Sequence, residues 1–194
     1  FLPFAIPTME RESFTESDDI FRICIPGSVD LKRRDYFTVI NAFKNACYDG
    51  DLNLELYLLG KANAKNHEVA ELLMQCDAIN NTFGKKIFYW NDYVPINKYE
   101  RIINLADSIL LNIKIYYQGV TGFEIYGLTK ETGILYSALN YQKSLISTYE
   151  YTLPSEISNN GLTYKNETDL AELFVMLKKS QNMDKGILDI NTFN

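Results

Sequence analysis

The chain has 194 residues, of which 46% are hydrophobic and 13% aromatic, and its formal net charge is -6 at pH 7. This length and composition predict one packed domain. The negative charge argues against general nucleic-acid binding, which needs a basic face that releases counterions. No apolar run approaches the ~20 residues that a membrane-spanning helix requires.

The first half of the chain alternates apolar runs with helical patterns. Residues 1–20 contain two prolines and a charged, Ser/Thr-rich stretch, and we expect a linker or a segment from a preceding domain. Phe21 to Ile25 predicts the first strand, and apolar residues from Tyr36 to Cys47 follow the spacing of a helix. Leu54 to Leu59 predicts a second strand, and the apolar stripe from Val69 to Cys76 predicts a second helix.

The same alternation continues towards the C-terminus. Lys86 to Trp90 predicts a third strand, and Tyr99 to Ala106 a third helix. Ser108 to Ile113 predicts a fourth strand, which a glycine-bearing loop follows. Thr132 to Tyr141 predicts a helix, and Ser144 to Ser147 a fifth strand.

A short sixth strand is predicted at Gly161 to Tyr164, and Asn166 caps a final helix. Strictly alternating strands and helices, with strands that are apolar almost throughout, indicate a parallel sheet covered on both faces. The fold class is therefore α/β, with a doubly wound, Rossmann-like, six-stranded parallel sheet over 21–180 and a tail over 181–194. Ligands of such sheets bind beyond the carboxyl ends of the strands.

Two segments of this predicted edge carry phosphate-binding chemistry. Lys32-Arg33-Arg34 follows the first strand, and a guanidinium there can pair two phosphate oxygens at once. Lys130, Thr132 and Gly133 belong to a loop that opens a helix, where free backbone amides and the helix dipole favour anions. The plainer readings are a solvated charge run and an ordinary helix start with a threonine cap.

Other classes of site are poorly supported by the sequence. Cys24, Cys47 and Cys76 are far apart and form no Cys-x-x-Cys pair, so we interpret them as buried, reduced thiols of a cytoplasmic protein. His67 is the only histidine and is predicted to face solvent. P-loop and dinucleotide-binding fingerprints are missing, and no metal-ligand cluster is visible. We therefore predict neither a cofactor nor a metal.

Six pieces of the chain, in register over 21–179, resemble the C-terminal, donor-binding domain of retaining two-domain (B-type) glycosyltransferases of group 1, or family 4. They are ICIPG, KRRDYFTVINAF, LELYLLGKA, KKIFYWNDYVP with NLADSILL, GILYSALNYQKSLIST, and PSEISNNGLTYKNETDLAEL. The resemblance implies that Gly27 lies near the donor diphosphate. It also implies that Arg33 or Arg34 is the phosphate-binding arginine, and that the loop from Thr129 to Gly133 wraps the donor.

The chain departs from the family at one motif. The family's Glu-x7-Glu pair falls on Thr129 and Ser137, and neither is an acid. Gln142 and Ser144 likewise replace the glycine and proline of the family's Gly-Lys-Pro turn. The working interpretation is a divergent subfamily in which Glu131, Thr132 and Ser137 recognise the donor.

The resemblance implies a domain that binds a nucleotide-diphosphate sugar. The whole enzyme would transfer the sugar, without a bound metal, to a glycan or lipid-linked acceptor in bacterial polysaccharide synthesis. This fragment would be inactive alone, because an N-terminal domain of the same protein supplies the acceptor site; peripheral contact of that protein with a membrane surface is left open. The alternatives are a non-catalytic α/β binding module or degenerate transferase and, ranked lower, an enzyme similar to a UDP-sugar 2-epimerase.

Overall fold

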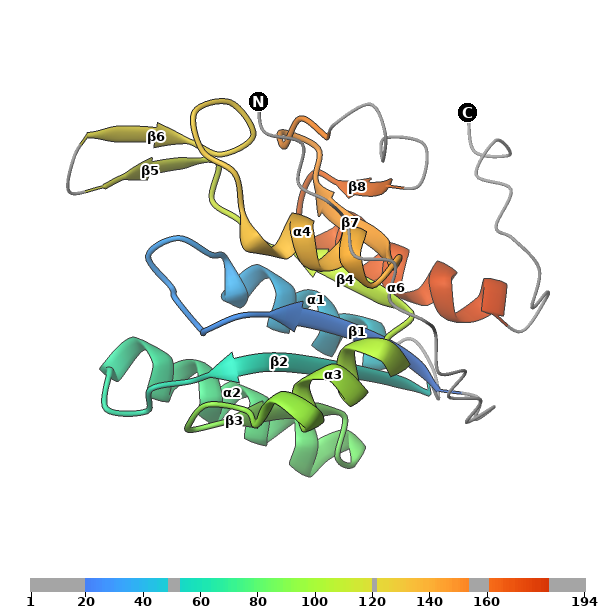
Figure 1. The fold of residues 1–194 in the computed structure, drawn as a ribbon. Coiled ribbons are helices and arrows are strands. Elements are labelled where there is room, and N and C mark those ends of the chain that lie inside the picture. Colours follow the sequence, from blue (N-terminus) through green and yellow to red (C-terminus); the bar gives the residue numbers. More distant parts are fainter. Residues whose placement is uncertain (1–19, 49–52, 120–121, 154–160, 182–194) are drawn as a thin grey trace.

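The computed structural model describes residues 20–48, 53–119, 122–153 and 161–181 (Figure 1). Its centre is a six-stranded sheet in the order β3-β2-β1-β4-β7-β8, in which every neighbouring pair is parallel. The strands are β1 (Phe21–Pro26), β2 (Leu54–Lys61), β3 (Ile87–Trp90), β4 (Ser108–Leu111), β7 (Ser144–Thr148) and β8 (Gly161–Tyr164). The strand order reverses between β1 and β4, so the ligand-binding edge of this fold type lies at their carboxyl ends.

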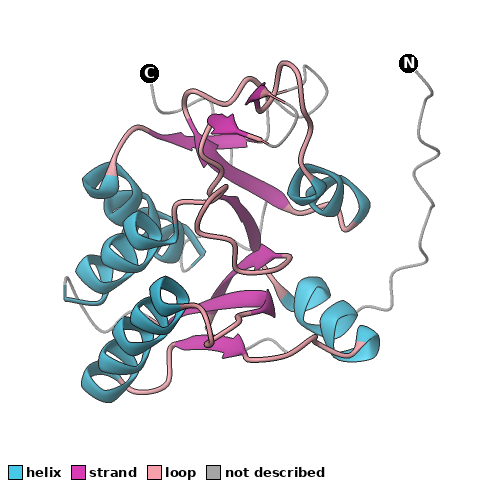
Figure 2. Cartoon of the chain, turned by 90° about the vertical axis from the view of Figure 1, so that its left-hand side faces the viewer, coloured by secondary structure: helices cyan, strands magenta, loops and turns pink. Residues whose placement is uncertain are grey.

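Helices cover both faces of the sheet. The helices α1 (Tyr36–Tyr48), α2 (His67–Phe83) and α6 (Glu167–Gln181) lie on one face, where α1 packs between the other two. On the other face, α3 (Ile96–Leu105) packs against β1, and α4 (Gly133–Asn140) packs against β4 and β7. Figure 2 looks onto the carboxyl edge and shows helices on both sides of the strands. The predicted doubly wound α/β fold is confirmed.

The core follows from strands that are buried on both faces. The register between β1 and β2 runs from Phe21 opposite Leu54 to Pro26 opposite Leu59. All four residues of β4 are buried, as are five of the six in β1. Because neither face meets water, these strands are apolar at successive positions and do not alternate with polar residues. The rings of Phe43 in α1 and Phe174 in α6 pack edge to face at one side of the core, with their centroids 6.2 Å apart.

The predicted order of strands and helices agrees with the structure, with ends that shift by a few residues. His67 is exposed, as predicted, and the three cysteines are free and buried. Burial raises the pKa of Cys47 to about 11 and that of Cys76 to about 12, so both thiols stay protonated and poorly reactive. None of the helices in the described ranges is long and apolar enough to cross a membrane.

One element was not predicted. The segment after β4 contains a two-stranded antiparallel hairpin, β5 (Tyr116–Gln118) and β6 (Phe123–Ile125), that projects beyond the main sheet (Figure 1). The amide of Gly119 donates to the carbonyl of Gly122 at 2.9 Å across its turn. Strands of three residues carry too little periodicity to be distinguished from a glycine-bearing loop.

Parts of the predicted organisation lie outside the described residues. The linker over 1–20 and the tail over 181–194 fall there except for residues 20 and 181. The same holds for 154–160, which includes the Pro-Glu pair of the family resemblance.

Candidate functional site

A pocket of about 220 Å³ opens at the carboxyl edge, beside the point where the strand order reverses. It brings together the loop after β1 and the loop that leads into α4. Six of the predicted site residues line it: Arg33, Arg34, Lys130, Glu131, Thr132 and Gly133. Ser28, Asp30, Ile113 and Tyr126 complete the wall. The two segments that the sequence singled out for phosphate binding therefore meet in space.

The loop after β1 is shaped by two glycines. Gly27 has φ 90°, a left-handed conformation that side chains other than glycine rarely adopt. Gly60, at the end of the neighbouring strand β2, approaches this loop so closely that an added Cβ would lie 2.2 Å from the carbonyl oxygen of Gly27. These contacts hold the chain tightly where it turns from the sheet towards Arg33 and Arg34.

Arg34 is the cation that the fold holds most firmly. Its Nη1 donates to the carbonyl oxygen of Pro26 at 2.9 Å and to the hydroxyl of Tyr36 at 3.1 Å. Its backbone forms an antiparallel bridge with Ile113 beyond β4, which ties the two loops together. Among the described residues Arg34 forms no ion pair, so no carboxylate competes directly for its guanidinium, which lines the pocket.

Arg33 is more exposed and is paired. Its Nε lies 2.6 Å from Oδ2 of Asp30, and 46% of its side chain is exposed to solvent. Burial alone would raise the pKa of Asp30, but the hydrogen bond and charge of Arg33, with nearby backbone amides, lower it below its ordinary value. The same hydrogen bond raises the pKa of Arg33. An incoming phosphate must therefore share Arg33 with a carboxylate.

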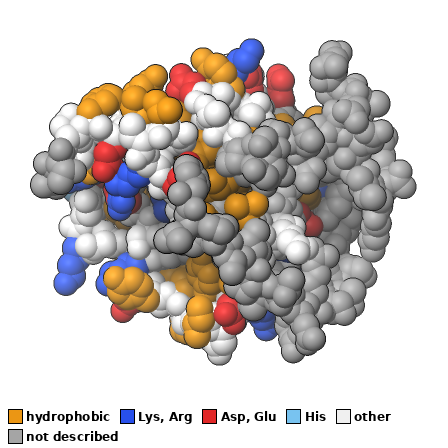
Figure 3. Space-filling model, turned by 45° about the horizontal axis from the view of Figure 1, so that its top comes forward, with side chains coloured by type: hydrophobic (Ala, Val, Ile, Leu, Met, Phe, Trp, Pro, Cys, Tyr) orange, Lys and Arg blue, Asp and Glu red, His pale blue; other side chains and the backbone are white. Residues whose placement is uncertain are grey.

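Lys130 is paired in the same way. Its Nζ donates to Oε2 of Glu124 on the hairpin at 2.6 Å and lies 5.7 Å from the centre of the Tyr126 ring. The hydrogen bond with Glu124 raises the pKa of Lys130. On the left of Figure 3, the side of the carboxyl edge, basic side chains accordingly stand next to acidic ones.

The start of α4 forms the floor of the site. The Thr132 hydroxyl accepts a hydrogen bond from the Ile134 amide at 3.3 Å and so caps the helix. Gly133 is the first helical residue, and a Cβ added there would meet no other heavy atom within 4 Å. The Ile134 amide donates to this cap and the Leu135 amide donates to the Thr132 carbonyl at 3.2 Å, so among the described residues the Gly133 amide is the first-turn donor without a partner. That amide and the helix dipole favour an anion at this position. Thr132 is thus a cap whose hydroxyl is already engaged.

The remaining predicted residues lie at or beyond the rim. Gly27 sits under the Arg34 side chain, since a Cβ at Gly27 would lie 2.9 Å from Nη2 of Arg34. Ser137 is one turn further along α4, outside the pocket lining, and its hydroxyl donates to the carbonyl of Gly133 at 3.1 Å. Gln142, which stands where the resembled family has a glycine, has φ 50°, a left-handed conformation that glycine adopts more readily than other residues.

The acidic and aromatic partners of the cations were not predicted from the sequence. Asp30 stands three residues before Arg33, a spacing that often allows a local ion pair, and this signal was available. Glu124 and Tyr126 come with the hairpin, whose folding the sequence did not reveal. Within the described ranges, no group of three or more His, Cys, Asp or Glu side chains is placed to hold a metal ion.

Two buried polar side chains near this edge have no hydrogen-bond partner among the residues that the structure describes. They are Asn112, which directly follows β4, and Ser147 of β7. The backbone carbonyl of Asn112 is satisfied, because it accepts from the Asp35 amide at 2.8 Å. The side chains themselves raise the cost of folding, because buried polar groups are normally paired.

Comparison with known proteins gives no sequence match. No protein-family model matches the chain, and no curated protein matches it. Solved structures do match. The C-terminal domain of the group 1 glycosyl transferase family protein LpcC from Francisella tularensis superposes with a TM-score of 0.60 at 16% identity, covering 84% of this chain and 77% of that one.

Two larger structures share the fold. Anabaena Alr3699/HepE, solved in complex with UDP and glucose, has a TM-score of 0.56 at 12% identity, covering 84% of this chain and 40% of that one. An apo structure of OtsA gives 0.61 at 9% identity, with 89% of this chain and 40% of that one covered. The chain therefore has the fold of a glycosyltransferase C-terminal domain, and it spans about two fifths of the length of these two proteins.

Proposed function

We propose that this domain is the donor-binding part of a glycosyltransferase and that its carboxyl-edge pocket binds the diphosphate of a nucleotide-sugar. The observation that carries the proposal is the convergence of Arg33, Arg34 and Lys130 in one pocket with the start of α4, where the Gly133 amide has no hydrogen-bond partner among the described residues. Such charge-assisted contacts are each worth roughly 1.5–3 kcal/mol and act on charge that develops on a departing diphosphate. The fold comparison supports the same class of protein.

The local charges assign different roles to the two arginines. Arg34 is held by a carbonyl and a hydroxyl and has no carboxylate partner among the described residues, so it is the principal phosphate contact. Arg33 pairs with Asp30 and Lys130 pairs with Glu124. Each cation can therefore bind a phosphate only when it leaves its carboxylate or is shared with it. The family resemblance left Arg33 and Arg34 undecided, and this difference in pairing favours Arg34.

The proposal extends to the protein as a whole. A partner domain would supply the acceptor site, and the sugar would pass to a glycan or a lipid-linked acceptor in the cytoplasm. The proposed reaction retains the configuration of the sugar and relies on guanidinium groups and helix amides to stabilise the diphosphate.

Titration with nucleotides tests the donor site. We expect calorimetry or chemical-shift titration to detect UDP, GDP or ADP with a dissociation constant on the order of 0.1–1 mM, because only part of the site is present. Arg34→Ala should weaken binding about tenfold, and Arg34→Lys, which keeps the charge but not the two-pronged geometry, should have an intermediate effect. Lys44→Ala, an exposed cation on α1, is the matched control.

The outcomes are distinct when thermal melting confirms that each variant is folded. No response to any of the three nucleotides at several millimolar contradicts the proposal. Equal binding by wild type and Arg34→Ala removes Arg34 from the site.

One observation favours a second candidate, a non-catalytic nucleotide-binding module. Thr129 and Ser137 stand where the resembled enzymes carry two acids, and Thr129 uses its hydroxyl within its own turn, accepting from the Ile125 amide at 2.9 Å. Sugar turnover by a longer polypeptide that includes the preceding domain would separate the two. Nucleotide binding without turnover would favour the module.

A further inference from the structure

The pocket contains a carboxylate that a phosphate site does not need. Glu131 lines the same pocket as Arg33, Arg34 and Gly133. An ionised carboxylate only accepts hydrogen bonds, and it repels a phosphate that lies nearby. It therefore suits the part of a ligand that donates hydrogen bonds. On a nucleotide-sugar, the hydroxyls of the ribose and of the transferred sugar are such donors, as are the N–H groups of the base.

The carboxylate of Glu131 is fixed by a residue far along the chain. The hydroxyl of Tyr151, in the turn after β7, donates to Oε2 of Glu131 at 2.8 Å. No other hydrogen bond or ion pair to the Glu131 side chain occurs within the described part of the chain, so the second oxygen keeps its full accepting capacity. One oxygen is anchored and the other is open to a ligand.

Tyr151 is itself rigidly placed. Only 3% of the residue is exposed, and its amide donates to the carbonyl of Thr148 at 3.1 Å. Its ring packs against Gly127, where an added Cβ would lie 3.4 Å from Cε2 of the ring. Gly127 has φ 83° and belongs to the loop that carries Lys130 and Glu131. Burial, followed by the hydrogen bond to Glu131, raises the pKa of Tyr151, so its hydroxyl remains a donor across the working pH range.

We propose that Tyr151 is a positioning residue that holds Glu131 as an acceptor for ligand hydroxyls, so that the pocket distinguishes a sugar-bearing diphosphate from bare pyrophosphate. The inference rests on the proposed donor site and adds a determinant of specificity to it. It assigns a role to Tyr151, which is not among the described residues that line the pocket. It also assigns a chemical role to Glu131, which lies outside the register of the family's Glu-x7-Glu pair.

The test measures selectivity between ligands with and without hydroxyls. Dissociation constants for inorganic pyrophosphate, UDP and UDP-glucose are determined by calorimetry for wild type, Tyr151→Phe and Glu131→Gln; GDP with GDP-mannose, or ADP with ADP-glucose, replaces the uridine pair if it binds more tightly. Tyr151→Phe keeps the packed ring and removes only the hydroxyl. We expect it to weaken the sugar nucleotide about fivefold and pyrophosphate less than twofold.

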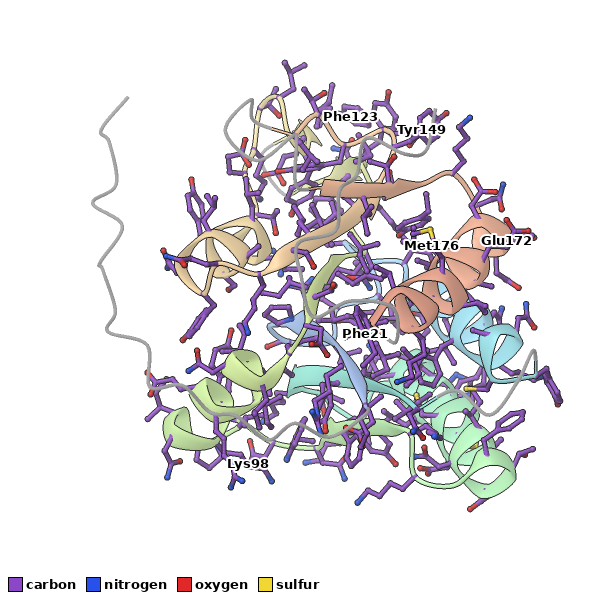
Figure 4. The ribbon with its side chains drawn as sticks, turned by 90° about the vertical axis from the view of Figure 1, so that its right-hand side faces the viewer. Phe21, Lys98, Phe123, Tyr149, Glu172 and Met176 are labelled. Atoms are coloured by element: carbon purple, nitrogen blue, oxygen red, sulfur yellow. The ribbon has the colours of Figure 1, made fainter. Side chains whose placement is uncertain are left out.

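Two further variants isolate the mechanism. Tyr149→Phe removes a hydroxyl from an exposed residue of the same turn, labelled in Figure 4, and should change neither affinity. Glu131→Gln should weaken the sugar nucleotide while leaving pyrophosphate unchanged or slightly tighter, because a negative charge is gone. In a Glu131→Ala background, Tyr151→Phe should have no additional effect, since it acts through Glu131.

Each outcome bears on a definite claim. A loss confined to UDP-glucose assigns the donor sugar as the source of the hydroxyls, and a loss shared by UDP assigns the nucleoside; either supports the inference. Equal losses for pyrophosphate and the sugar nucleotide, or no loss at all, overturn it while the donor site stands. If the wild-type protein binds none of these ligands, the proposed donor-binding function is itself contradicted.

Discussion

The two walls of the pocket are built in opposite ways. The wall after β1 is tied into the core: Gly60 presses against Gly27, and Arg34 is held by backbone and by the buried Tyr36. The wall after β4 leaves the sheet as a hairpin whose Tyr116 and Phe123 are more than half exposed.

Figure 4 shows Phe123 at the outer end of the molecule, away from Phe21 in the sheet. Changes in the first wall should therefore cost folding free energy. Changes in the second should alter ligand binding more than stability, because few of its side chains support the core.

The largest expected effect tests the first wall. Gly60→Ala should lower the free energy of unfolding by about 3 kcal/mol or more, because its methyl group meets backbone atoms of Gly27 that cannot move without disturbing β1. Urea unfolding followed by circular dichroism measures the change. Gly133→Ala, where the new methyl has open space, should stay within about 0.5 kcal/mol of wild type. A loss below about 1 kcal/mol for Gly60→Ala would show that the loop at Gly27 can move to accommodate the methyl group.

The floor of the pocket, at the start of α4, should respond in binding. Gly133→Ala places a methyl group there, beside the backbone amide that we propose receives the phosphate. We expect about a tenfold loss of affinity for UDP or the best-bound diphosphate, equivalent to about 1.4 kcal/mol, with unfolding unchanged. Calorimetry on the same samples used for unfolding checks both halves of the statement. Undiminished affinity would place the ligand elsewhere.

The smallest effect concerns Asp30, which belongs to the first wall and lines the pocket. Asp30→Asn should tighten pyrophosphate binding about threefold, because Arg33 loses the carboxylate that competes with phosphate. The same change should cost only about 0.5 kcal/mol of stability, as for other exposed ion pairs. Weaker pyrophosphate binding in Asp30→Asn would mean that Asp30 orients Arg33 and does not compete with the phosphate.

The pH dependence of this pair has a definite sign. The pKa of Asp30 is lowered in the folded protein, so its stabilising contribution is present above its ordinary pKa and is lost as the pH falls through the folded value. The difference in unfolding free energy between wild type and Asp30→Asn should be constant from pH 5 to 7 and shrink below about pH 4. A difference that persists unchanged in acid would rule out the ion pair as its source.

Some segments of the fold could be predicted from the sequence and others could not. The strand at Phe21 and the stripe from Tyr36 to Cys47 were predictable because apolar periodicity reports directly on burial. The meeting of Arg34 with Gly133 also followed, because parallel strands deliver their loops to one edge. The hairpin did not follow, since its strands are too short to show a pattern.

What the sequence determined by itself is the layered α/β fold and the edge at which basic residues and a helix start converge. Local spacing encodes both. Strands that alternate with helices, joined by right-handed crossovers, are compatible with few other topologies. Only the tertiary structure decided which charges are neutralised. Lys130 pairs with Glu124 across a hairpin, and Glu131 is held by Tyr151 from another strand's turn. Such pairings depend on distances between separate elements, which no local pattern specifies.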